Sequence, residues 1–202
     1  MGNLDLSTII YRVITLLVAF TIHEFSHAWV ATQLGDDTPR LEGRLSLNPL
    51  RHLDPWGCLM LIIVGFGWAK PVHVNPYAVT RKNKAGMMLV AAAGPFSNLL
   101  LAILGAILLR MRWIPLPAYF LRLFIWTNLS LLVFNLIPLS PLDGEKVLGY
   151  FIPDSGKQTW AQIQRYGQQI LMMVFFVLPY LGMPFAQNLI VNITFSLYRI
   201  LV

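Results

Sequence analysis

The stretch from Ser7 to Val30 reads STIIYRVITLLVAFTIHEFSHAWV, and it decides what kind of fold this chain can adopt. A helix of about 20 apolar residues, rising about 1.5 Å per residue, crosses a bilayer core of about 30 Å. This stretch is long and apolar enough to do so, yet it carries His23, Glu24 and His27 near its end. We therefore expect a membrane-spanning helix with ionisable groups inside it.

The composition of the whole chain agrees with a membrane protein. Of its 202 residues 56% are hydrophobic and only 12% are charged, and the mean hydropathy is +0.63. Soluble globular domains contain about 25% charged residues, so this composition excludes a typical cytosolic protein and intrinsic disorder. The single cysteine excludes a disulfide scaffold. No stripe of basic and aromatic residues accompanies the net charge of +6, so we expect no nucleic-acid partner.

Three further apolar segments are long enough to cross a membrane, and they are residues 85–109, 123–142 and 166–198. The last contains Pro179, Gly182 and Pro184, so it is either one long kinked helix or a tight hairpin of two helices. The sequence leaves both possibilities open. The shorter segment Pro55–Ala69 is interrupted by glycines and is predicted to be partly inserted or re-entrant, with an ordinary short helix as the alternative.

These segments predict an all-α polytopic membrane protein with four to six transmembrane or re-entrant segments. We expect residues 1–202 to form a single integral-membrane domain, with a core at 7–150 and C-terminal membrane segments at 166–202. Apolar and polar residues alternate over Leu41–Leu47, which is a weak signal for a strand.

The distribution of basic residues predicts the orientation of the chain. Seven of the 15 Lys and Arg residues lie between the first and second spans, and Lys146, Lys157 and Arg165 lie between the third and fourth. Basic loops stay on the cytoplasmic side of a membrane. We therefore expect these two loops in the cytoplasm, the N-terminus outside, and the loop between Arg110 and Arg122 outside as well.

The sequence His23-Glu24-Phe25-Ser26-His27 has the spacing of a helical metal site. Residues four apart share a helix face, so both imidazoles can reach one metal ion. Glu24 is offset by about 100° from His23, which places its carboxylate beside a metal-bound water as a general base. Ionisable groups at membrane depth are functional candidates. The alternative is a polar contact between helices in which His and Glu satisfy each other.

A catalytic zinc site has a third protein ligand, and the sequence offers more than one candidate. Gln33 stands where the longer HExxHxxGxxH pattern places a third His, so that class is excluded. His52 and His73 lie in polar loop sequence, and Glu42 lies among charges where a solvated role is expected. Asp143 follows an uncharged span broken by prolines and is the better candidate, although an Asp before Gly can also be a cap or turn residue.

Together these motifs resemble the site-2 protease family of intramembrane zinc metalloproteases. Residues 23–27 are similar to the HExxH helix of that family, and Asn135–Gly144 is similar to its NxxPxxxLDG motif. Further similar motifs follow the family's order at residues 43–55, 67–72 and 93–98. The resemblance is to the short form, since the chain leaves no room between its spans for a PDZ-like domain.

The resemblance implies roles for individual residues. It implies Asp143 as the third zinc ligand and Glu24 as the general base and proton shuttle. Asn135 is implied as a polar group near the substrate backbone or the oxyanion, and Asn98 as a second substrate-binding residue, with an interhelical hydrogen bond as its alternative. It also implies a small membrane-associated β-hairpin at residues 43–55.

The implied activity is zinc-dependent hydrolysis of peptide bonds in or near transmembrane segments of membrane proteins, in the cell membrane and with the active site toward the cytoplasm. The alternating Leu41–Leu47 segment is a candidate to pair with an unwound substrate as an added strand. Two alternatives use the same ligands without cleavage: a metal-binding transporter and a catalytically silent adaptor. Ligand type indicates zinc, although other divalent metals fit the same ligands.

Overall fold

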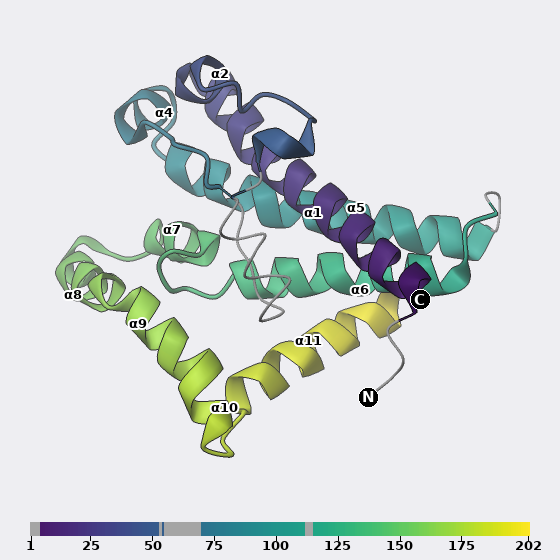
Figure 1. Ribbon diagram of the computed structural model, residues 1–202. Helices are drawn as coiled ribbons and strands as arrows, with labels where there is room; N and C mark the ends of the chain where they lie inside the picture. Colours follow the sequence, from purple (N-terminus) through teal and green to yellow (C-terminus); the bar gives the residue numbers. More distant parts are fainter. Residues whose placement is uncertain (1–4, 53, 55–69, 112–114) are drawn as a thin grey trace. The chain divides into compact units, whose positions relative to one another are not determined.

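The computed structural model describes residues 5–52, 54, 70–111 and 115–202. Over these residues the regular elements are all helical (Figure 1). The chain divides into two compact units, residues 1–97 and 98–202, and each is described by itself. The boundary falls inside helix α5, after Ser97.

Three helices of the described chain are long and apolar enough to cross a membrane. They are α1 (Leu6–Gln33), α5 (Gly86–Met111) and α6 (Ala118–Asn135). The sequence predicted all three, but it extended the last one to residue 142. The helix ends at Asn135 because Pro138 and Pro141 lack the backbone N–H that a helix needs.

The fourth apolar segment forms two helices that meet at 99°. The first arm, Gly167–Tyr180, consists of α9 (Gly167–Met172), a π-helical turn η2 (Met173–Val177) and α10 (Leu178–Tyr180). The second arm is α11 (Phe185–Leu201). Gly182 adopts a φ of 80° between the arms, a conformation that L side chains rarely adopt. This angle is larger than that of a kinked single helix and smaller than the reversal of a tight antiparallel hairpin. The segment is therefore a broken span or a re-entrant loop.

The first unit packs the C-terminal half of α1 against two neighbouring helices. Ala31 of α1, Val79 of α4 (Pro76–Lys82) and Val90 of α5 form its buried apolar cluster. The buried carboxylate of Asp36 ties the loops together, accepting hydrogen bonds from the backbone N–H of Thr38 and of Asn75, at 3.0 and 2.7 Å. These bonds fix the chain directly after α1, which carries the histidines.

The predicted strand at Leu41–Leu47 is wrong. Leu41 ends a short helix, α2 (Thr38–Leu41), and Gly43 then turns the chain with a φ of 68°. The Arg44 side chain is buried and donates hydrogen bonds to Arg51 O at 2.6 Å and to Pro71 O at 3.2 Å. An alternating pattern produces a strand only when one face is apolar and buried, whereas here the arginine points inward and Leu41 is 85% exposed.

The β-hairpin expected at residues 43–55 is not supported either. Its described part contains a short 3₁₀ helix, η1 (Pro49–Arg51), and no strand. The rest of the expected hairpin, and the predicted re-entrant segment Pro55–Ala69, lie outside the described residues. The proposal that Leu41–Leu47 adds to a substrate as a strand therefore loses its structural basis.

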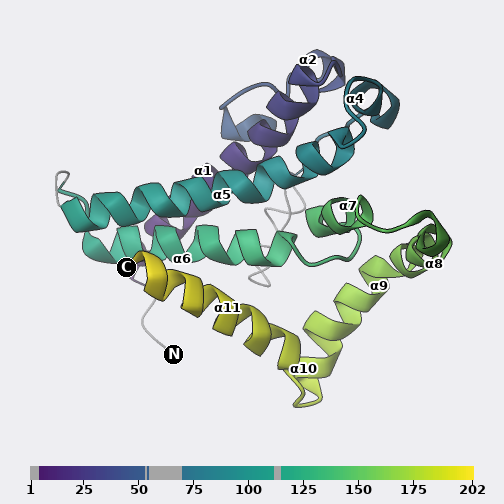
Figure 2. The same ribbon diagram turned by 180° about the vertical axis from the view of Figure 1, so that it is seen from behind.

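The second unit contains the C-terminal half of α5, α6 and α11, with α7 (Asp143–Gly149) and α8 (Asp154–Arg165) between them in sequence. Ala102 and Ala106 let α5 approach α6, where Ile125 and Leu129 are fully buried. In both views α11 lies along α6 (Figures 1 and 2). Small residues at such a contact are typical of helices that pack inside a bilayer.

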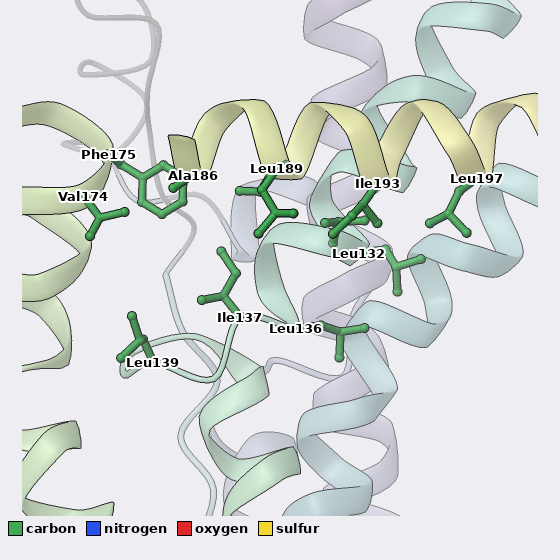
Figure 3. A pocket seen from close by; sticks show the side chains of 12 residues that line it. Leu132, Leu136, Ile137, Leu139, Val174, Phe175, Ala186, Leu189, Ile193 and Leu197 are labelled. Carbon is green, nitrogen blue, oxygen red and sulfur yellow. The ribbon is translucent and has the colours of Figure 1, made fainter. Parts of the chain in front are cut away.

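An apolar cavity of about 430 Å³ lies between α6 and the two bent arms (Figure 3). Leu132 lines it from α6 and Leu136 from the residue directly after that helix. Phe175 lines it from the first arm, and Leu189 and Ile193 line it from α11. Its wall is almost entirely hydrocarbon, which suits a bilayer environment and gives a polar ligand nothing to bind.

Candidate metal centre

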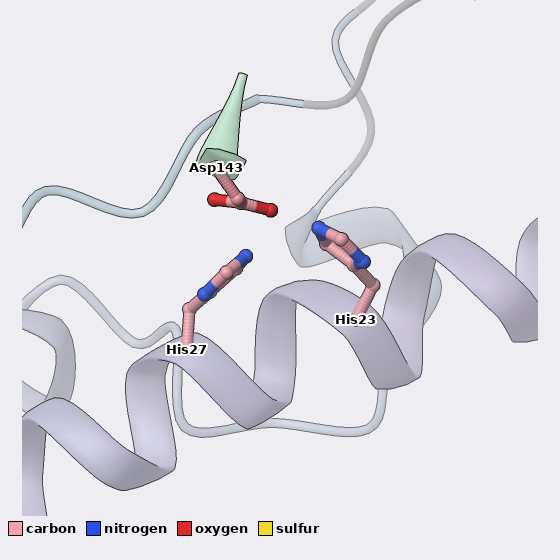
Figure 4. Close-up of side chains that lie close together, drawn as sticks. All are labelled: His23, His27 and Asp143. Carbon is pink, nitrogen blue, oxygen red and sulfur yellow. The ribbon is translucent and has the colours of Figure 1, made fainter. Parts of the chain in front are cut away.

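The two histidines of the predicted motif lie on one face of α1. Their ring centroids are 4.7 Å apart and the rings are nearly perpendicular, at 81°. A ligand nitrogen of His23 lies within 4.8 Å of one of His27 (Figure 4). Both side chains are buried, with 5% and 7% exposed. Two buried imidazoles that converge in this way are suited to binding one metal ion.

A backbone carbonyl fixes the orientation and the tautomer of His27. Its Nδ1 lies 2.7 Å from the carbonyl oxygen of Val90 on α5. Because a carbonyl can only accept, Nδ1 carries the proton and donates it, and Nε2 keeps the lone pair that a metal needs. Metal-binding histidines usually have such a partner on their other nitrogen.

Gly94 packs directly against both imidazoles. A Cβ built on Gly94 would lie 2.6 Å from both Cε1 and Nε2 of His23 and closer still to Nε2 of His27. Only glycine therefore lets α5 approach the two rings in these positions. Two buried imidazoles, with the tautomer of His27 set by Val90, fit a zinc ion held by His23 and His27.

Glu24 lies one residue beyond His23 on the same helix and is half-buried. Within the described part of the chain it has no ion-pair partner. A carboxylate that is neither exposed nor neutralised by a nearby cation can accept a proton when one is delivered to it. Its role as a general base remains a prediction.

Asp143 belongs to the second unit, where it is the first residue of α7; its side chain is drawn with the histidines in Figure 4. Gly144 beside it is buried, and a Cβ there would lie 2.5 Å from the carbonyl oxygen of Ile137. Glycine is therefore required after Asp143, because no side chain fits between this position and the chain that follows α6. The role of Asp143 as a zinc ligand remains a prediction.

The two asparagines named as substrate-binding residues occupy different surroundings. Asn98 is fully buried, and its Nδ2 donates to Oδ1 of Asn128 on α6 at 3.0 Å. This is the interhelical hydrogen bond that the sequence left open as its alternative role. Asn135 is half-buried at the last residue of α6, where its Nδ2 donates to Leu131 O at 3.0 Å.

The loop histidines have partners within the first unit. His73 Nδ1 lies 2.9 Å from Glu42 Oε1, so His73 pairs with an acidic residue of another loop. His52 is buried and its Nε2 donates to Ser46 O at 2.7 Å. Glu42 is thus engaged with a loop histidine.

Sequence reasoning missed Val90 and Gly94 as parts of this centre. Gly94 lies in the Ala93-Gly94-Pro95 motif, and a glycine inside an apolar helix signals a close approach by another group. Nothing in the sequence marks Val90, since its backbone carbonyl makes the contact.

Helices of membrane length, one of which presents a convergent pair of histidines followed by a glutamate, define the class of membrane metalloproteases. Comparison with known proteins agrees. The chain is 43% identical over 184 residues to "Putative zinc metalloprotease YwhC" of Bacillus subtilis (strain 168), covering 86% of this chain and 83% of that protein. The profile of Peptidase family M50 matches residues 111–178. The chain belongs to Peptidase family M50, and as a member it is a zinc-dependent peptidase.

More distant relatives carry similar names. The chain is 31% identical over 167 residues to the Rip2 protein of Mycolicibacterium smegmatis, and 30% identical over 168 residues to that of Mycobacterium tuberculosis (strain H37Rv), both also named as zinc metalloproteases of putative function. These matches cover 63% and 64% of the relatives. No solved structure matches the chain.

Proposed function

We propose that this protein is an intramembrane zinc endopeptidase that cleaves peptide bonds in or near the transmembrane segments of other membrane proteins. The observation that carries the proposal is the buried pair His23 and His27 on a helix of membrane length, packed against Gly94. Membership of Peptidase family M50 and the names of its relatives support it.

We propose His23, His27 and Asp143 as the zinc ligands. Two imidazoles and one carboxylate are a common ligand set for catalytic zinc, and they leave a position open for water. When bound, zinc supplies Lewis-acid polarisation of the scissile carbonyl and makes water a nucleophile at neutral pH. Because Asp143 belongs to the other unit, the proposal requires residues 1–202 to work as one integral-membrane domain.

Glu24 carries the proton transfers in this proposal. Its carboxylate accepts a proton from the attacking water and then returns it to the nitrogen of the leaving amine. The side chain is half-buried within a membrane-length helix and lacks a neighbouring cation among the described residues, so its carboxylate is not already committed to an ion pair.

The substrate must expose its backbone before cleavage, because the hydrogen bonds of a transmembrane helix are internal. We propose that Asn135 binds this exposed backbone. The bond from its Nδ2 to Leu131 O fixes the amide so that Oδ1 is the atom available to a substrate N–H. For Asn98 we propose the interhelical role, since its side chain is fully buried against Asn128.

The proposed orientation places the active site toward the cytoplasmic side of the cell membrane. His23 and His27 lie in the second half of α1, directly before the loop that carries seven basic residues. The third span ends shortly before Asp143, beside the other basic loop. Basic loops stay in the cytoplasm, so both ligand-bearing ends face that side.

The proposal is tested by expressing the wild type, Glu24→Gln and Glu42→Gln in matched membranes and identifying fragments of transmembrane proteins by mass spectrometry. Glu42→Gln is the matched control, since Glu42 pairs with His73 in a loop. Fragments should appear with the wild type and the control and fall by about 10²–10⁴-fold with Glu24→Gln, while all three forms keep their zinc. Equal fragments from all three forms would contradict the role of Glu24, and none from any form would favour the adaptor reading.

A further inference from the structure

The segment between α6 and α7, which leads into Asp143, makes few backbone hydrogen bonds of its own. Pro138 and Pro141 have no N–H to donate. Leu139 N donates to Ile137 O at 2.8 Å, and Leu142 N donates to Leu139 O at 2.9 Å. A segment with so little internal bonding depends on outside contacts to hold one conformation.

Gln164, in the last turn of α8, supplies such a contact with both ends of its amide. Its Oε1 accepts a hydrogen bond from Ser140 N at 2.7 Å, and its Nε2 donates to Pro138 O at 3.0 Å. A primary amide carries one acceptor and one donor group, so it matches a backbone N–H and a backbone C=O two residues apart. One side chain thus holds three consecutive residues of the segment.

Gly167, three residues after Gln164, brings its own backbone into contact with the backbone of Ser140. Gly167 is buried, and a Cβ there would lie 2.6 Å from Ser140 O and 2.8 Å from Ser140 N. The start of α9 therefore packs directly on Ser140. Gln164 and Gly167 together form a clamp, made by the junction of α8 and α9, on residues 138–140.

We propose that Gln164 is a positioning residue of the metal centre, which holds the 138–140 segment so that Asp143 meets the zinc ion. The inference rests on the proposed role of Asp143 as the third ligand. Leu142 N bonds to Leu139 O inside the clamped segment, so the clamp is connected to the residue before Asp143 by one hydrogen bond. Metal–ligand distances tolerate deviations of only about 0.2 Å, so a loosened segment weakens binding even though Asp143 is intact.

The test measures the zinc affinity of the purified full chain in detergent micelles by competition with a chelator. Loss of an outer partner of a metal ligand lowers affinity by about 10–100-fold, and we expect this from Gln164→Ala. Gln164→Glu keeps the acceptor for Ser140 N but turns a carboxylate oxygen toward Pro138 O in place of the donor, so it should lower zinc affinity as well. The control is Gln162→Ala, which removes an exposed side chain of the same kind from the same helix and should leave affinity unchanged.

A double-mutant cycle separates positioning from a general structural effect. If Gln164 acts through Asp143, then Gln164→Ala should not lower zinc affinity further in an Asp143→Ala background. Two results would overturn the positioning role. One is that Gln164→Ala lowers zinc affinity equally in the wild-type and Asp143→Ala backgrounds. The other is that Gln164→Ala binds zinc like the wild type while Asp143→Ala binds it more weakly. If Asp143→Ala itself binds zinc like the wild type, the ligand assignment fails, and the inference about Gln164 fails with it. If Gln164→Ala does not fold, Gln164→Glu decides, since it retains one of the two bonds.

Discussion

Replacing Gly94 with alanine places one methyl group directly against both imidazoles. The added Cβ would lie 2.6 Å from Nε2 of His23, whereas ordinary contacts to a Cβ are 3.4–4 Å. The ring of His23 must therefore retreat by about 0.8 Å, and the ring of His27, which is nearer, by more.

The size of the effect follows from the strictness of zinc coordination. Zinc–nitrogen bonds are about 2.0–2.1 Å long and tolerate deviations of about 0.2 Å. The displacement of both rings exceeds this tolerance of about 0.2 Å. Loss of a group that only hydrogen-bonds to a metal ligand lowers affinity by up to about 100-fold, so Gly94→Ala should lower zinc affinity by more than that. A factor of 100 corresponds to about 2.7 kcal/mol. In the metal-free protein, alanine favours the helix over glycine by about 1 kcal/mol, which offsets the cost of rotating the rings.

The assay compares zinc content and chelator competition for the wild type, Gly94→Ala and Gly105→Ala, with thermal unfolding of the metal-free forms. Gly105→Ala makes the same change in the same helix, but its Cβ would meet side-chain atoms of Ile125, at 2.9 Å. Zinc binding should be lost only with Gly94→Ala, and the metal-free melting temperatures should stay similar. Wild-type zinc affinity in Gly94→Ala would refute the assignment of these two imidazoles as metal ligands.

Three further outcomes are expected. Asn135→Ala should lower the rate of cleavage while zinc binding and thermal stability stay near wild type. Asn98→Ala should instead cost about 1–3 kcal/mol of unfolding free energy, because Oδ1 of Asn128 loses its buried donor. The reverse pattern would exchange the two proposed roles. A chelator should abolish cleavage and added zinc should restore it, and cleavage that persists after the zinc content has fallen to zero would contradict a zinc-dependent mechanism. Reporter fusions in the loop between Arg110 and Arg122 should report the outer side of the membrane, and cytoplasmic signals there would reverse the proposed orientation.

Features that depend on neighbours along the chain were predictable from the sequence. The helix of Ser7–Val30 follows from its apolar length, and the convergence of His23 and His27 follows from the periodicity of that one helix. The broken C-terminal segment was signalled by Pro179 and Gly182, although the sequence did not give the angle between its arms.

The strand predicted at Leu41–Leu47 failed for a physical reason. Alternation produces a strand only if the backbone finds a partner strand and one face is buried, and the alternating segment itself shows neither. Here the guanidinium of Arg44 instead turns inward and binds the carbonyl groups of Arg51 and Pro71. The sequence does not distinguish an arginine whose side chain is buried from one whose side chain is solvated, so the pattern did not reveal this arrangement.

The sequence by itself determined the membrane class, the spans and the helical pair of histidines, since each rests on composition or on residues within one helical turn. Only the tertiary structure decided what surrounds that pair and its candidate partner. The Val90 carbonyl that orients His27 lies 63 residues away, and the amide of Gln164 holds a segment 24 residues before it. Such contacts join groups with no local pattern, a backbone oxygen in one case and a common polar side chain in the other, so only the folded chain can bring them together.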